Sequence, residues 1–200
     1  MRNVRVFFAN IGLILFIAII CNPVQAHTLG SPRGGFIAGF FHPISGPDHV
    51  MAMIAVGLWG AILGPPALWI LPTAFPIVMA LGGLMGFLGI HIPGIEIGIA
   101  LSALVMGVMV LIECKPVLWI SLTMVSIFAI FHGHAHGTEI PTGSSALQFS
   151  MGFVVATGLL HLIGIALGEA TYSPQKKAMV KILGALISLS GLFFLIKAVF

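Results

Sequence analysis

The chain contains very little charge. Only 6% of its 200 residues are Asp, Glu, Lys or Arg, and 59% are hydrophobic, whereas a soluble domain carries about 25% charged residues. The sequence shows no soluble domain and no Gly-rich nucleotide loop, so any energy for its activity must come from a gradient or a partner. Its basic residues are too scattered to follow a phosphate backbone, which excludes nucleic acid as a partner. We therefore predict an integral membrane protein surrounded by a lipid bilayer.

Cysteine and acidic residues are also scarce, and histidine is not. The chain has two cysteines, five acidic residues and eight histidines. Cys114 is the only cysteine outside the predicted leader, so it has no partner for an internal disulfide. Eight imidazoles in a chain that otherwise avoids polar side chains need an explanation, and histidine is the commonest metal ligand.

The N-terminus has the pattern of a secretory leader. A basic start precedes an apolar stretch, and Val24 and Ala26 occupy the minus-three and minus-one positions of a cleavage site. We expect residues 1–26 to be a signal peptide and residues 27–200 to form one transmembrane domain; an uncleaved first helix is the alternative. After cleavage, the α-amine and imidazole of His27 would form a candidate metal chelate on the outer face.

Hydropathy predicts an all-α integral membrane protein with six transmembrane helices. A spanning helix needs about 20 mainly apolar residues, and Gly/Pro pairs and charged residues interrupt the apolar sequence at regular intervals. The predicted spans are 34–62, 67–90, 94–112, 117–135, 146–168 and 178–198.

The direction of insertion follows from two independent arguments. A cleaved leader places the mature N-terminus outside the bacterial inner (plasma) membrane. Counting through six spans then puts most of the remaining basic residues inside, in agreement with the positive-inside rule. These inner residues are Lys115, Lys176, Lys177 and Lys181.

The first span carries the motif His42-Pro43-Ile44-Ser45-Gly46-Pro47-Asp48-His49. A carboxylate at membrane depth costs roughly 2.5–3.5 kcal/mol even on mild insertion scales, so Asp48 needs a counterpart. On a straight helix His42 and His49 would lie about 10 Å apart along the axis.

We expect the two prolines and the glycine to break the first span at this motif. The break would let His42, Asp48 and His49 surround one cation, with freed backbone carbonyls completing the site. The alternative is a kinked helix whose histidines bond to neighbouring helices.

A second motif, from Phe131 to Glu139, ends the fourth span on the outer face. In a helix His132 and His136 share one side, and in an extended chain His134 joins them. With Glu139 these residues form a nitrogen and carboxylate ligand set that suits a borderline divalent ion. The alternative is a solvated polar loop.

Two further histidines lie apart from the motifs. His161 falls near mid-depth of the fifth span, where an intramembrane imidazole is a functional candidate by default; its alternative role is one interhelical hydrogen bond. His91 lies in an outer loop, where it would line an entrance with His27 or be merely polar. Glu96 begins the third span, where a helix N-terminus favours an anion.

The stretch from His42 to Trp59 resembles the signature of the HupE/UreJ family of hydrogenase- and urease-associated membrane proteins, and the segment His132 to Glu139 resembles that family's second motif. The resemblance implies a nickel permease, or a cobalt permease in some members. Ni²⁺ or Co²⁺ would then be the transported substrate, with no permanent cofactor. The resemblance also implies metal-binding roles for His42, Asp48, His49, His132, His134, His136 and Glu139.

Our interpretation is therefore a permease, not an enzyme, that moves the ion inward by facilitated diffusion, with proton coupling left open. One alternative is a non-transporting membrane accessory protein for metallocentre assembly. Another is an intramembrane hydrolase that uses Ser45 and His49, although Pro43 and Pro47 offer no N–H donors for an oxyanion hole. The choice between nickel and cobalt and the existence of a homo-oligomer stay open.

Overall fold

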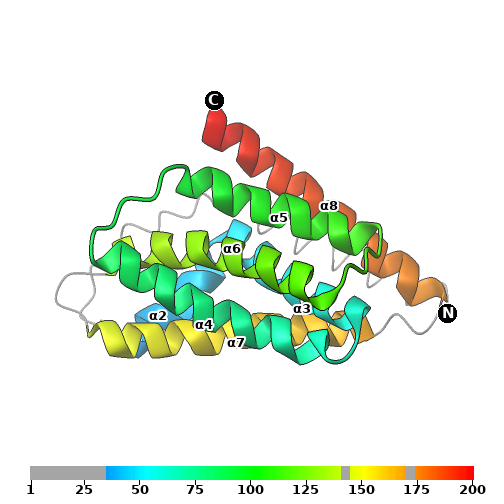
Figure 1. The fold of residues 1–200 in the computed structure, drawn as a ribbon, viewed down its shortest axis with the longest axis horizontal. Helices are drawn as coiled ribbons and strands as arrows, with labels where there is room; N and C mark the ends of the chain where they lie inside the picture. The colour runs from blue at the N-terminus through cyan, green and yellow to red at the C-terminus, as the bar shows by residue number, and fades with distance from the viewer. Residues whose placement is uncertain (1–34, 141–144, 170–173) are drawn as a thin grey trace.

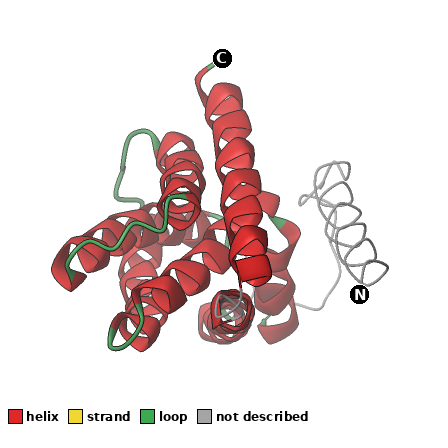
Figure 2. Cartoon of the chain, turned by 90° about the vertical axis from the view of Figure 1, so that its right-hand side faces the viewer, coloured by secondary structure: helices red, strands yellow, loops and turns green. Residues whose placement is uncertain are grey.

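The computed structural model describes residues 35–140, 145–169 and 174–200, which fold into α-helices with no strand (Figures 1 and 2). The predicted signal peptide and His27 lie outside these residues. The helices are α2 (Phe36–Ser45), α3 (Pro47–Leu63), α4 (Ala67–Phe87), α5 (Ile95–Leu111), α6 (Leu118–Thr138), α7 (Ala146–Glu169) and α8 (Pro174–Val199).

Most of these helices are suited to a bilayer. Four of them, α4, α6, α7 and the Lys177–Val199 part of α8, are long and apolar enough to cross a membrane. The pair α2 and α3 makes a fifth candidate span, bent by 85°. Helix α5 is apolar but only 17 residues long. The prediction of an all-α membrane protein is confirmed, whereas the count of six spans stays a prediction.

The predicted break in the first span is present, and it falls at Gly46. The backbone of Gly46 is extended, with φ −95° and ψ 109°. Pro47 then begins α3, a position where its missing N–H and fixed φ favour a helix start. Pro43, by contrast, lies inside α2 without ending it. The sharp turn thus comes from the Gly46-Pro47 pair, and Pro43 does not unwind the chain as expected.

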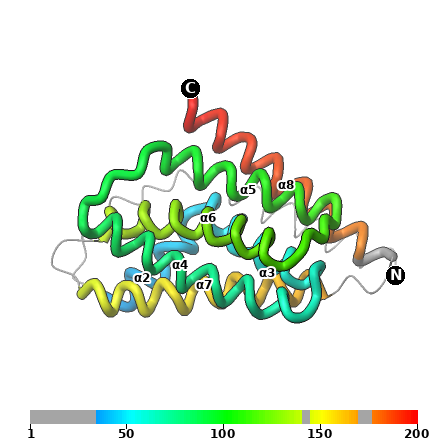
Figure 3. The backbone as a smooth tube through the Cα atoms, viewed as in Figure 1, coloured from blue at the N-terminus to red at the C-terminus, as the bar shows by residue number. Residues whose placement is uncertain are grey.

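Helix α3 forms the centre of the molecule. It contacts α2, α4, α5, α7 and α8, and most of its side chains from Met51 to Ile62 are buried. Helices α5 and α8 pack together on one side of the molecule, and α4 runs along α6 (Figures 1 and 3). The position of α3 fixes the Gly46 turn against its neighbours.

Glycines allow the closest helix crossings, as the small-residue pattern of membrane helices predicts. A methyl group at Gly57 of α3 would collide with the carbonyl oxygen of His161, and one at Gly164 of α7 with that of Ile54. Helices α4 and α6 approach in the same way, since a methyl group at Gly86 would strike the backbone of His134.

The end of the molecule away from Gly46 is held by charge. Glu113, in the loop between α5 and α6, lies 2.9 Å from the Nζ of Lys177 and 3.3 Å from that of Lys181. These ammonium groups, Lys177 first, hold the pKa of the Glu113 carboxyl below its usual range. In the same loop the Cys114 carbonyl accepts a 2.9 Å hydrogen bond from the Trp59 indole. The loop is thereby tied to both α8 and α3.

The α3–α7 crossing predicts opposite effects for two glycines of α7. Gly164→Ala should lower the free energy of unfolding by about 1–3 kcal/mol, because the added methyl group overpacks a close crossing. Gly158→Ala should be neutral or stabilising by up to about 1 kcal/mol, because nothing lies within 4 Å of its added carbon. Thermal unfolding of both variants in detergent measures the difference. Equal loss of stability in the two variants would contradict the crossing.

Candidate metal site

The structure brings the two sequence motifs together. Helix α6 extends to Thr138, so the second motif is helical and its histidines are buried, unlike a solvated loop. His132 and His136, one turn apart, face the rings of the first motif, as expected for the helical alternative. The motifs therefore form one site between α2, α3 and α6, rather than an entrance above a separate ion site.

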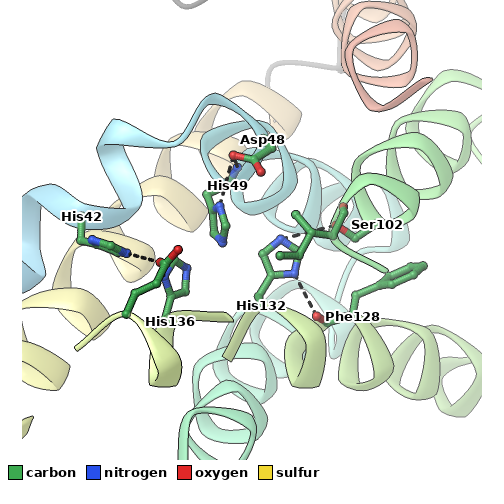
Figure 4. A network of polar contacts seen from close by, with 9 residues as sticks. His42, Asp48, His49, Ser102, Phe128, His132 and His136 are labelled. Carbon is green, nitrogen blue, oxygen red and sulfur yellow. Dashed lines mark hydrogen bonds and ion pairs between the residues drawn. The ribbon is translucent and has the colours of Figure 1, made fainter. Parts of the chain in front are cut away.

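Four imidazoles form a continuous row in this site (Figure 4). Ring centroids are 4.8 Å apart for His42 and His136, 4.2 Å for His136 and His49, and 4.7 Å for His49 and His132. His49 points between the two histidines of α6. The row begins at a ring on α2 and ends at a ring in the interior of the molecule.

Asp48 orients His49. Its Oδ1 accepts hydrogen bonds from the His49 backbone N–H at 3.0 Å and from the His49 Nδ1 at 3.2 Å. Because a carboxylate only accepts, Nδ1 carries the proton and Nε2 presents a lone pair. That Nε2 is buried and has no hydrogen-bond partner among the described residues. A carboxylate behind the imidazole is the usual support of a metal-ligating histidine.

A backbone carbonyl orients the His132 ring in the same way. Its Nδ1 donates to the Phe128 carbonyl at 2.9 Å, and the residue is 0% exposed. The Ser102 hydroxyl lies 3.5 Å from its Nε2 but donates its proton to the Ile99 carbonyl at 2.6 Å. With that proton directed to Ile99, the described residues provide no second donor for the Nε2 lone pair of His132.

The outer end of the row includes a carboxylate. The His42 Nε2 donates to Glu139 Oε2 at 3.0 Å, and the His136 Nδ1 lies 3.5 Å from the same oxygen. Ligand atoms of these three residues all lie within 4.8 Å of one another. The side chains of His42 and Glu139 are 23% and 52% exposed. His136 first, and His42 second, hold the pKa of the Glu139 carboxyl well below its usual range.

This arrangement differs from the predicted convergence of the first motif. The 85° bend sends His42 toward Glu139 and His136, whereas Asp48 lies behind His49. His42, Asp48 and His49 therefore do not surround a single point. Asp48 supports a candidate ligand rather than standing beside His42.

The remaining candidate histidines lie outside the row. The His134 Nε2 donates to the Ile90 carbonyl at 2.6 Å, which ties α6 to the loop after α4. His91 is exposed in that loop. His161 is buried in α7, and its Nδ1 donates to the Pro72 carbonyl of α4 at 3.2 Å. Only Phe75 among the described aromatic rings lies against both His132 and His161, with centroid distances of 5.6 and 5.5 Å.

A cavity of about 220 Å³ opens beside the row and shows what the sequence did not predict. Glu96 lines it together with Asp48, His49 and Glu139, although the sequence predicts for Glu96 only a role at a helix N-terminus. A carboxylate at the start of an apolar helix is the signal that would have found it. Phe75 had no comparable signal, because it is one of 15 phenylalanines.

The ligand set suits a borderline divalent ion. It offers imidazole nitrogens and carboxylate oxygens in a largely buried setting, and these donors accommodate Ni²⁺, Co²⁺ and Zn²⁺. Cys114, the cysteine within the described residues, lies in the loop beyond the far end of α6, so the site offers no thiolate for Cu⁺. Hydrogen bonds behind His49 and His132 leave the Nε2 atom of each ring unprotonated.

The fold and this site define a helical membrane protein with a cluster of histidine and carboxylate side chains between α2, α3 and α6. The chain belongs to the family described as HupE / UreJ protein, which it matches over residues 15–194. It is 40% identical over 181 residues to Protein HupE of Rhizobium leguminosarum bv. viciae, covering 90% of this chain and 95% of that protein. No solved structure gave a significant match. The resemblance seen in the sequence is thus confirmed.

The two faces of α6 predict different effects on metal binding. His136→Ala should weaken Ni²⁺ binding to the purified protein by at least about tenfold, because it removes the ring shared by His42 and His49. His134→Gln should leave the Ni²⁺ affinity within about threefold of the parent value, since the glutamine amide can still donate to the Ile90 carbonyl in the loop after α4. Equilibrium dialysis with ⁶³Ni measures both. Equal losses would show that the two faces are not distinct.

Proposed function

We propose that this protein carries Ni²⁺, or Co²⁺ as the next choice, across the bacterial inner membrane into the cytoplasm by facilitated diffusion. The observation that carries the proposal is the row of four imidazoles, which leads from an exposed carboxylate to a fully buried ring. The ion is the substrate, not a resident cofactor. Membership in the HupE/UreJ family supports the same conclusion.

The row supports movement because successive ligand groups lie close together. The centroids of neighbouring rings are 4.2 to 4.8 Å apart. An ion that leaves one nitrogen therefore meets the next before it loses all of its ligands. Glu139 would meet the hydrated ion at the surface, and His136, His49 and His132 would replace its water in turn. Binding at several weak sites, rather than one tight site, is what conduction requires.

The two ends of α6 support transport in the inward direction. The histidine row lies at the C-terminal end of this 21-residue helix, and Lys115 lies just before its start. The two ends are separated by about 30 Å. The positive-inside rule assigns the lysine end to the cytoplasm, so the row faces outward. An inside-negative potential then favours entry of a divalent ion by about 4.6 kcal/mol per 100 mV.

The hydrolase alternative has less support from the geometry. The Ser45 hydroxyl donates to the Phe41 carbonyl at 2.8 Å within its own helix, and the His49 Nδ1 is held by Asp48. Neither group is arranged as a nucleophile with a base.

The accessory-protein alternative predicts that the protein binds metal without moving it. Transport by the purified protein therefore decides between the permease and the accessory protein.

Uptake by proteoliposomes tests the proposal directly. With an inside-negative potential, protein-loaded vesicles should accumulate ⁶³Ni faster than empty vesicles, and ⁵⁷Co measured in parallel ranks the two ions. His49→Ala should abolish at least about 90% of the protein-dependent rate, since it removes the ring that joins His136 to His132. Ser45→Ala should retain the parent rate and serves as the control. A parent rate equal to that of empty vesicles would refute transport.

The pH dependence has a definite sign. Metal binding needs unprotonated imidazole, and an unperturbed imidazole gains its proton near pH 6.5. The Glu139 carboxylate, whose pKa is lowered by His136 and His42, stays charged throughout this range. Uptake at constant membrane potential should therefore fall as the pH is lowered and the imidazoles of the row gain protons. A rate that rises when only the outer pH is lowered would instead indicate proton coupling.

A further inference from the structure

His161 is a buried imidazole that the histidine row does not include. It lies on α7 and is 1% exposed. Phe153, eight residues earlier on the same helix, contacts the His136 ring at a centroid distance of 4.3 Å. Eight residues of helix advance about 12 Å, so His161 lies deeper than His136, toward the lysine end of the molecule. The Phe75 ring lies between His161 and His132, the deepest member of the row.

A proline in α4 explains how His161 is held. In a continuous helix the Pro72 carbonyl would accept the backbone N–H of residue 76, but Pro76 has none. The His161 Nδ1 lies 3.2 Å from this carbonyl and donates to it. The bond satisfies the carbonyl in a setting without water. It also places the proton on Nδ1, which leaves a lone pair on Nε2.

The bond to Pro72 does not account for the other side of the ring. The His161 Nε2 is buried and has no hydrogen-bond partner among the described residues. The hydroxyl of Thr157, one turn earlier on the same face of α7, is likewise buried without a partner. Two unpaired polar groups on one helix face, where lipid and side chains exclude water, are a costly arrangement without a ligand.

We propose that the His161 Nε2 and the Thr157 hydroxyl form a second contact point for the transported divalent ion, on the cytoplasmic side of Phe75. This inference rests on the proposed transport function and deepens it. The ion passes from His132 around the edge of the Phe75 ring to His161, which already has the tautomer that a metal requires. A role limited to joining α7 and α4 would use the Nδ1 alone.

The variant His161→Asn separates these roles. The asparagine amide N–H takes the place of Nδ1–H and can still donate to the Pro72 carbonyl, but the variant lacks any atom at Nε2. In ⁶³Ni uptake by proteoliposomes, we expect the maximal rate to fall at least tenfold. The half-saturating Ni²⁺ concentration, which the outer row sets, should stay within twofold of the parent value. Equilibrium dialysis should likewise show unchanged Ni²⁺ affinity at the row.

Thr157→Val provides an independent test because it removes one hydroxyl at constant volume. We expect it to lower the maximal rate about threefold or more without changing the half-saturating concentration. Parent-like rates in either variant would overturn its part of the contact point, and parent-like rates in both would overturn the proposal. If His161→Asn does not purify as a monodisperse protein, Thr157→Val decides alone, and an unchanged rate overturns the proposal.

These outcomes differ from a failure of the proposed function. If the parent protein accumulates neither Ni²⁺ nor Co²⁺, transport itself is refuted, and with it the second contact point. If the parent transports and His161→Asn transports equally well, transport stands and His161 only joins two helices. A rise in the half-saturating concentration with an unchanged maximal rate would place His161 in the outer row and would also overturn the proposal.

Discussion

The turn at Gly46 sets the geometry on which the site depends. Two imidazoles seven residues apart in sequence would lie about 10 Å apart on a straight helix, too far to share a ligand. The 85° bend lets α2 approach α6 from one side and α3 from another, so that His42 and His49 both contact the His136 ring. Because α3 is buried among five helices, the packing of the whole bundle holds this turn in place.

The bilayer itself helps to prepare the candidate ligands. Without water, each buried N–H must find an acceptor inside the protein. His49 donates to the Asp48 carboxylate, and His132 donates to the Phe128 carbonyl. His161 donates to the Pro72 carbonyl, which has no backbone partner because residue 76 is a proline. Each bond uses Nδ1 and leaves Nε2 unprotonated. The requirement that makes an intramembrane histidine costly thus also selects the tautomer that binds metal.

Hydropathy and the positions of Gly and Pro predicted the helices well, since each predicted span corresponds to a helix or to the α2–α3 pair. The break was predicted as well, but it falls at Gly46 and Pro47, and Pro43 stays inside α2. The union of the two motifs was not predictable, because the rotation of α6 about its axis is set by its packing against α4 and α5. The role of His134 depended on a loop carbonyl, that of Ile90, which no sequence pattern identifies.

The length of α5 has a consequence for the membrane around the protein. Its 17 residues rise about 25 Å, about 5 Å less than a typical hydrocarbon core. As the predicted third span, a helix of this length would create hydrophobic mismatch, which lipids relieve by thinning locally. Because α5 packs beside α3, the thinned lipid would lie next to the ion-binding side chains. The distance that an ion must travel through low dielectric would then be shortened by the surrounding lipid as well as by the protein.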